Sequence, residues 1–107
     1  MKLIELVSFF KNEGSFEKFC QNKSLNIDSE VIGIYMEKPF DIDNNLVFFE
    51  IEKTEGKMEY FSNGINYFNL FDFYYFLDVI EESNNENKSL TNAEIARVLL
   101  SYAINNA

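Results

Sequence analysis

Apolar residues recur at helical spacing along the first part of the chain. Within residues 2–10 they fall at positions 3, 4, 6, 7, 9 and 10, which predicts a helix with a broad buried face. Gly14 predicts the end of this helix, because glycine readily adopts the left-handed conformation that follows a last helical turn. Ser15 is the expected N-cap of a second, short helix, in which Phe16 and Phe19 point inward together.

The middle of the chain has a different pattern, with short segments rich in β-branched and aromatic residues that are typical of strands. We predict three strands, over residues 31–36, 46–52 and 58–62. A turn at 54–57 is expected to join the second strand to the third, and Asn63 with Gly64 forms another tight-turn signal. Because the three strands follow one another closely, the natural expectation is an antiparallel meander.

Helical spacing returns after Asn66. Asn69 is the expected N-cap of a helix whose buried stripe consists of Leu70, Phe73, Tyr74, Leu77 and Ile80. The polar residues 83–89 predict a loop. Thr91 and Glu94 then have the spacing of a capping box. The last helix is expected to bury Ile95, Val98, Leu99 and Tyr102.

The order of these elements is helix, helix, three strands, helix, helix. This separation of strands from helices favours an α+β fold. We expect a single domain over residues 1–107, in which a small antiparallel sheet of about three strands is flanked by N-terminal and C-terminal helices packed on one face.

Charge narrows the possible functions. The 107 residues include 18 Asp and Glu against 9 Lys and Arg, with no histidine, so the formal charge is −9. Histidine is the usual general base near neutral pH and the commonest metal ligand, and its absence argues against most hydrolytic and metal-centred chemistry. A strongly acidic surface attracts basic partners and repels nucleic acid and anionic membranes. We therefore expect a non-enzymatic protein without a cofactor that binds a positively charged partner.

The remaining sequence signals concern compartment and the single cysteine. Cys20 lies in an apolar, helix-like stretch and is expected to be a buried thiol rather than a nucleophile, because no histidine can activate it. Residues 1–7 include Glu5 and no small-residue cleavage site, unlike a signal peptide. No apolar run is long enough to span a membrane. These features predict a cytoplasmic protein.

A group of acidic and amide residues approaches the pattern of a calcium-binding EF-hand loop. Loop positions 1, 3, 5 and 12 would be Asp41, Asp43, Asn45 and Glu52. Leu46 stands where such a loop requires glycine, and the residues that follow predict a strand instead of a helix. We therefore expect no metal ion here.

Acidic residues next to aromatic ones define a candidate binding surface on the predicted sheet. Alternation along 46–52 is expected to bury Val47, Phe49 and Ile51 beneath the helices and to expose the opposite face. A solvated sheet face and an acidic docking surface both fit that exposed side, whereas glycoside chemistry would need carboxylates paired across a cleft. The predicted partner-binding residues are Asp41, Asp43, Phe48, Glu50, Glu52, Glu59 and Tyr60.

Five segments carry a resemblance to a known family, and they read SFEKF (15–19), EVIGIY (30–35), FFEIE (48–52), EYFSNG (59–64) and LFDFYYFL (70–77). Together they resemble the immunity proteins of bacterial contact-dependent growth inhibition systems. These are core and turn residues, so no binding residue can be transferred from the family. The resemblance implies a protein that neutralises a cognate toxin domain by covering its active site or substrate groove. That toxin is often a nuclease, and nucleases tend to be basic because they bind phosphates.

Two other classes of protein remain open at this stage. An acidic mimic of nucleic acid, which inhibits a DNA- or RNA-binding enzyme, would place its carboxylates in phosphate-like rows. A small enzyme or ligand-binding domain would use the aromatic residues to line a pocket.

Overall fold

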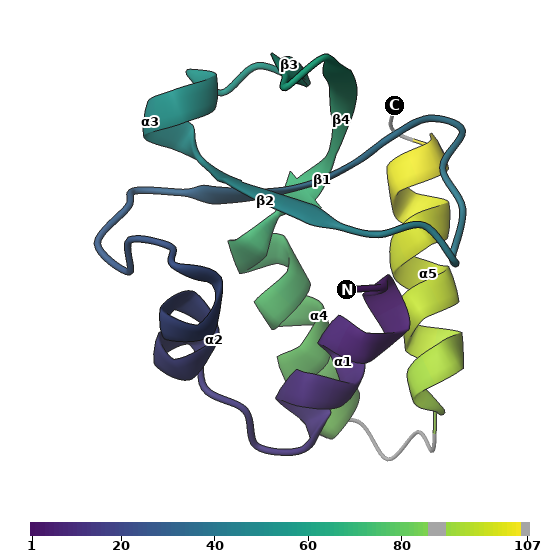
Figure 1. Ribbon diagram of the computed structural model, residues 1–107. Helices are drawn as coiled ribbons and strands as arrows, with labels where there is room; N and C mark the ends of the chain where they lie inside the picture. The colour runs from purple at the N-terminus through teal and green to yellow at the C-terminus, as the bar shows by residue number, and fades with distance from the viewer. Residues whose placement is uncertain (86–89, 106–107) are drawn as a thin grey trace.

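The computed structural model describes residues 1–85 and 90–105. The strands are β1 (Ile32–Met36), β2 (Val47–Glu50), β3 (Glu59–Ser62) and β4 (Ile65–Asp72). The helices are α1 (Leu3–Lys11), α2 (Phe16–Lys23), α3 (Ile51–Thr54), α4 (Phe73–Asn85) and α5 (Asn92–Asn105). Figure 1 shows α1, α2 and α4 below the sheet and α5 along its side, with α3 and β3 at the opposite end. The predicted α+β fold, an antiparallel sheet with helices packed against it, is confirmed, with four strands instead of about three.

The two N-terminal helices lie where the sequence predicts them, but the left-handed residue after α1 is Glu13, with a φ of 66°, and not Gly14. α1 buries Leu3 and Leu6, and the backbone N–H of Gly14 donates to the carbonyl oxygen of Phe9 at 2.9 Å just after it ends. A Cβ on Gly14 would lie 2.5 Å from that same carbonyl oxygen, so the close turn needs glycine. Ser15 caps α2 as predicted, because its hydroxyl accepts a hydrogen bond from a backbone N–H of the first turn at 3.1 Å.

The strand β4 was not predicted from the sequence. Asn63 and Gly64 have φ angles of 51° and 81°, so the chain reverses within two residues and continues directly into β4, which pairs with β3. The expected N-cap at Asn69 is therefore wrong. Asp72 begins α4 instead, and its Oδ1 accepts a hydrogen bond from the backbone N–H of Tyr75 at 2.8 Å.

The predicted meander is also wrong, because the strands lie in the order β2-β1-β4-β3. β2 pairs with β1, from Ile32 opposite Glu50 to Tyr35 opposite Val47, and ends two residues earlier than expected. The chain then forms the single turn of α3. Glu55, with a φ of 55°, ends that turn, so residues 54–57 are not a hairpin and β2 and β3 lie at opposite edges of the sheet.

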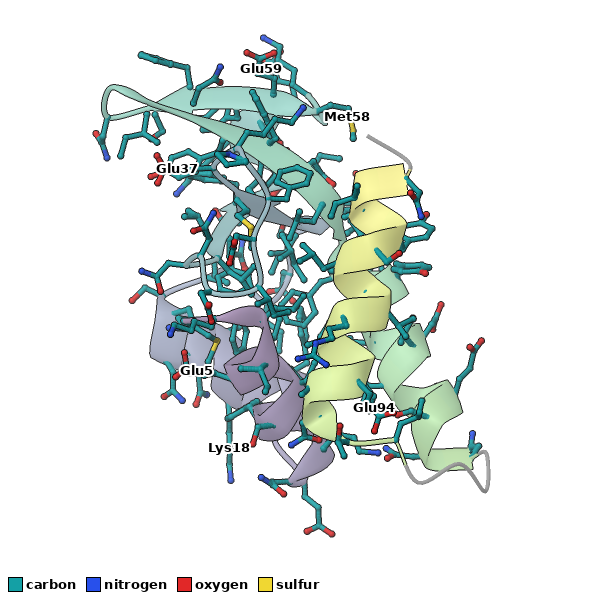
Figure 2. All side chains as sticks on the ribbon, turned by 90° about the vertical axis from the view of Figure 1, so that its right-hand side faces the viewer. Glu5, Lys18, Glu37, Met58, Glu59 and Glu94 are labelled. Carbon is teal, nitrogen blue, oxygen red and sulfur yellow. The ribbon has the colours of Figure 1, made fainter. Side chains whose placement is uncertain are left out.

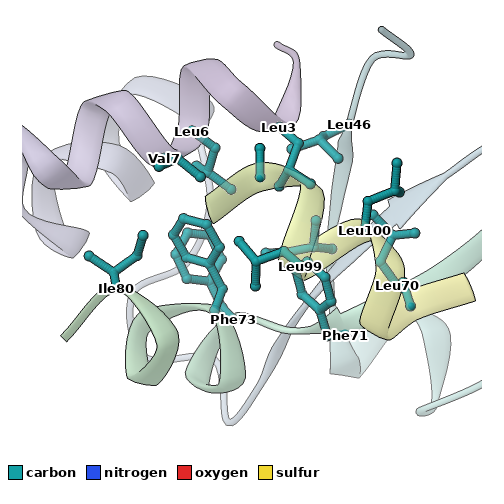
Figure 3. Close-up of a cluster of buried hydrophobic side chains, with 14 of the residues drawn as sticks. Leu3, Leu6, Val7, Leu46, Leu70, Phe71, Phe73, Ile80, Leu99 and Leu100 are labelled. Atoms are coloured by element: carbon teal, nitrogen blue, oxygen red, sulfur yellow. The ribbon is translucent and has the colours of Figure 1, made fainter. Parts of the chain in front are cut away.

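The main core lies between the sheet and the helices. It includes residues from α1, β1, β4, α4 and α5, several of which are labelled in Figure 3. An irregularity in the β1–β4 pairing, between Ile34 and Tyr35, allows the consecutive residues Leu70 and Phe71 both to be buried in this core. Phe73 is a central side chain and is almost fully buried.

The opposite face of the sheet carries a second aromatic cluster. The ring of Phe49 on β2 lies 5.3 Å from Tyr35, 4.9 Å from Tyr60 and 5.5 Å from Tyr67, measured between centroids. Phe49 and Tyr60 belong to the two edge strands, so the sheet curls until its edges approach each other. The hydroxyl of Tyr35 donates to the carbonyl oxygen of Lys57 at 2.6 Å, which fixes the segment that leads into β3.

The predicted orientation of β2 is therefore reversed. Phe48, expected on the exposed face, lies on the helix side with its ring centroid 4.9 Å from that of Phe19. Phe49, expected beneath the helices, packs in the cluster on the other face. Alternation correctly separates the two residues, but it cannot assign the faces here because both faces of the sheet bury aromatic rings.

The C-terminal helix has the predicted start, and its buried face matches the prediction only in part. The backbone N–H of Thr91 donates to Glu94, and the Glu94 N–H donates to the Thr91 hydroxyl, both at 3.1 Å, which confirms the capping box. Val98 is 57% exposed, contrary to prediction, and Tyr102 is also exposed. Ile95 and Leu99 are buried as predicted, and Ala96, Leu100 and Ala103 complete the buried face. Two of these residues are small alanines, and α5 packs against α1. Of the predicted loop, residues 83–85 belong to α4, and residues 86–89 lie outside the described part of the chain.

Candidate protein-binding surface

The structure does not bring the predicted partner-binding residues together on one face. Asp41 and Asp43 are exposed in the connection between β1 and β2, where Asp41 Oδ1 accepts a hydrogen bond from the Asp43 N–H at 2.8 Å. Phe48 is partly buried against the main core. Glu50 and Glu52 lie beside the connection from α2 to β1, whereas Glu59 and Tyr60 lie on the other edge strand.

The carboxylates of Glu50 and Glu52 hold the connection between α2 and β1. Glu50 Oε2 accepts a hydrogen bond from the Asn26 N–H at 2.6 Å. Glu52 accepts from the hydroxyl of Ser29, and also from the Glu30 N–H at 3.3 Å. The Ser29 hydroxyl is the main cause that lowers the pKa of Glu52. These contacts give both acids a structural role, and their part in partner binding stays a prediction.

Replacement of Ser29 by alanine should raise the pKa of Glu52 toward the ordinary value of about 4.3. The folded-state pKa of Glu52 is lowered, so its stabilising contribution is present above the ordinary value and is lost as the pH falls through the folded pKa. The measurement is an NMR titration of the side-chain carboxyl carbon in both proteins. Glu94 is the internal control, because its lowered pKa depends on Thr91. An unchanged Glu52 titration would contradict this assignment.

An exposed apolar surface lies on the edge strand β3 and the residues beside it. We call it the β3 surface and define it as Lys57, Glu59, Phe61 and Asn66, with Met58 just outside it. Phe61 is 68% exposed and Met58 is 59% exposed. An open groove of about 480 Å³ is lined by Lys57, Glu59, Tyr60, Phe61 and Asn66. Figure 2 shows Met58 and Glu59 at the sheet end of the molecule, far from Glu94 at the opposite end.

Strand alternation explains why Phe61 is exposed while Tyr60 is not. Tyr60 points to the inner face and packs on Phe49. Phe61 and Glu59 point the other way, on the side shared with Asn66 and Phe68, which lie opposite them on β4. Phe68 is covered by the Lys38 ammonium group, 4.4 Å from the ring centroid. Lys38 therefore covers Phe68 but not Phe61, which remains exposed.

The outer edge of β3 has no neighbouring strand among those described. Among the described strands, β3 pairs with β4 alone and forms an edge of the sheet. The Asn66 side-chain amide donates to the Glu59 carboxylate across the hairpin, which orders that carboxylate beside Phe61. An ordered acid next to an exposed phenylalanine, at a sheet edge, is suited to binding another protein.

The acidic charge of the chain is little compensated within the fold. Within residues 1–85 and 90–105, the salt bridge between Lys53 and Glu50, with 3.7 Å between nitrogen and oxygen, is the one present. The net charge of −9 therefore produces a negative field around the molecule.

The side chains that could have supported catalysis or metal binding have surroundings that do not favour either role. Cys20 is buried, and burial together with the nearby Glu50 carboxylate raises the pKa of its thiol, so the thiol stays protonated at neutral pH. No cluster of three or more acidic or cysteine side chains suited to a metal ion occurs in the described ranges. Within the same ranges, no helix combines the length and apolar character needed to cross a bilayer.

Sequence reasoning identified Glu59 and Tyr60 but missed Phe61 and Asn66. The signal was present in the alternation of 58–62, where Glu59 and Phe61 necessarily share one side of the strand. Asn66 was missed because β4 was not predicted, and the position of Asn66 follows from its pairing opposite Phe61 on β4.

Comparisons with known proteins gave no match. No family model matches the chain, and neither a curated protein nor a solved structure matches it. The resemblance to immunity proteins therefore stays a prediction from the sequence.

Proposed function

We propose that this protein is a non-enzymatic inhibitor that binds a basic toxin domain and covers its active site or substrate groove, as an immunity protein of contact-dependent growth inhibition would. The observation that supports this most is the β3 surface on a chain of net charge −9. Large apolar side chains that remain exposed beside polar ones commonly mark sites of protein association. Aromatic residues are also enriched at the centres of such interfaces.

Charge and anchor residues have separate parts in the proposed mechanism. An enzyme that cleaves nucleic acid presents a basic groove to its substrate. The negative field of the inhibitor would steer the inhibitor to that groove. Phe61 would then enter an apolar depression on the toxin, while Glu59 pairs with a basic side chain at its rim. Steering sets the association rate, and the buried anchor slows dissociation.

Replacement of Phe61 by alanine should weaken toxin binding by about 2 kcal/mol or more, roughly 30-fold in Kd, because a central aromatic anchor is lost. Glu59→Lys should weaken binding by about tenfold through charge reversal at the rim.

The proposal implies that the toxin gene lies beside the gene for this protein. The probe is therefore the purified toxin fragment of that gene's product, and calorimetry measures the Kd.

Matched controls separate the surface from general effects of charge or size. Glu17→Lys on α2 makes the same charge change as Glu59→Lys, and Ile27→Ala removes another exposed apolar side chain; both should keep binding within about twofold. Association of the unmodified protein should also slow as salt rises, since the screening length is about 8 Å at physiological ionic strength. Wild-type affinity in Phe61→Ala would rule out the β3 surface. Failure of the unmodified protein to bind the fragment, or to protect cells that express it, would overturn the function.

A further inference from the structure

A second apolar surface, partly exposed, runs between the two C-terminal helices. We call it the α4–α5 seam and define it as Tyr75, Val79, Leu90, Val98 and Tyr102. Tyr75 and Val79 are one turn apart on α4, and Val98 and Tyr102 are one turn apart on α5. The rings of Tyr75 and Tyr102 stack with their centroids 4.2 Å apart and an angle of 18° between their planes. The two helices thus present one continuous apolar line.

One end of the seam forms a groove. It has a volume of about 170 Å³ and is lined by Val79, Glu82, Ser83, Leu90, Ile95 and Val98. Ile95 is fully buried and forms the floor, whereas Val98 on the wall is more than half exposed. Such a depression suits an apolar side chain from another molecule, because its walls are largely aliphatic.

Acidic side chains outnumber basic ones around the seam, and the Lys11 ammonium on α1 donates to the groove residue Ser83 at 3.4 Å. Asp78 and Glu82 are one turn apart on α4 and both are exposed, and Glu94 is exposed at the start of α5. Arg97 is the one basic residue within the described residues of α4 and α5. A second copy of this chain would bring the same acids against each other, which is unfavourable. The charge pattern therefore favours a partner that is basic.

We propose that the α4–α5 seam binds a basic amphipathic helix of a partner protein. A groove between two helices accommodates a third helix, whose apolar residues at positions i, i+3, i+4 and i+7 can follow the seam. One such residue would enter the groove at Val98, and Lys or Arg side chains on either side of the apolar stripe would contact Asp78, Glu82 and Glu94. The groove end of this site is separate from the β3 surface, because Figure 2 shows Glu94 and Glu59 far apart, toward opposite ends of the molecule.

The test uses a synthetic peptide of about 18 residues, long enough to form a helix, with leucines at helical spacing on one face and lysines on the other. Binding is followed by NMR of the methyl groups of the full protein. We expect the peptide to shift the Val79, Leu90 and Val98 methyl signals. Val98→Asp and Glu82→Lys should each reduce affinity by about tenfold, since one makes the groove wall polar and the other reverses a rim charge.

Two controls distinguish this site from attraction to an acidic protein in general. A peptide of the same composition without the helical spacing should bind at least about tenfold more weakly. The Phe61→Ala variant, altered at the β3 surface, should bind the amphipathic peptide like the unmodified protein, so failure of one site does not imply failure of the other. Absence of binding, methyl shifts located elsewhere, or full affinity in Val98→Asp would overturn the proposal.

Discussion

Replacement of Phe73 by alanine should lower the free energy of unfolding by about 3–5 kcal/mol, the range for truncation of a buried aromatic residue. Phe73 is 1% exposed. Its ring centroid lies 5.0–6.0 Å from those of Phe10, Phe16, Phe19, Phe48 and Phe76. These rings come from α1, α2, β2 and α4, so the cavity would lie where four elements meet. Urea unfolding followed by circular dichroism measures the change.

Phe61 is the matched control for this prediction. The same substitution there should change the free energy of unfolding by about 0.5 kcal/mol or less, because the ring is mostly exposed. The two variants therefore separate stability from binding. A loss below about 1 kcal/mol in Phe73→Ala would mean that the aromatic core can collapse around the gap.

Replacement of Leu99 by alanine should lower the free energy of unfolding by about 2–5 kcal/mol. Leu99 is fully buried in the main core, where α5 packs against α1 (Figure 3). The truncation removes apolar contacts and leaves a cavity between elements far apart in the sequence. Thermal and urea unfolding should both show the loss, with no change in the urea m-value if the transition remains two-state.

The adjacent residue Val98 provides the control, since Val98→Ala should change the free energy of unfolding by about 0.5 kcal/mol or less. Equal losses at the two positions would mean that α5 is rotated relative to this structure, with the predicted face, Val98 and Tyr102, buried after all.

Local signals in the sequence correctly predicted the features that depend on a few neighbouring residues. Ser15 and the Thr91–Glu94 pair both cap helices, because capping needs only a side chain and the first turn that follows it. Asn63 and Gly64 form the expected tight turn for the same reason. The α+β class followed from the change between helical and strand spacing.

Features that depend on distant contacts were predicted less well. Leu70 and Phe73 have helical spacing, yet Leu70 lies in β4, because pairing with β1 overrides the local pattern. The face of β2 was reversed because the second aromatic cluster, around Phe49, makes both sides of the sheet apolar. The buried face of α5 was wrong at Val98 and Tyr102, because Ala96 and Ala103, rather than larger residues, form part of its contact surface.

The candidate site illustrates the same division. Glu59 was identified because acids are conspicuous in a sequence, and Phe61 was missed because most phenylalanines in this chain are expected in its core. Only the structure shows that the sheet extends beyond the cover at Phe68 and leaves Phe61 exposed. Conversely, Glu50 and Glu52 look like surface acids in the sequence but bind the backbone and hydroxyl groups of a neighbouring connection.

The packing of α1 against α5 constrains how the chain folds as it is synthesised. Residues 12–91 separate the two helices, so α1 leaves the ribosome long before its main helical partner has been made. The pairing of β1 with β4 also joins distant segments, and contacts of this kind slow folding because a long loop must close first. The apolar face of α1 therefore remains without its partner, and is a potential chaperone-binding segment, until α5 has emerged.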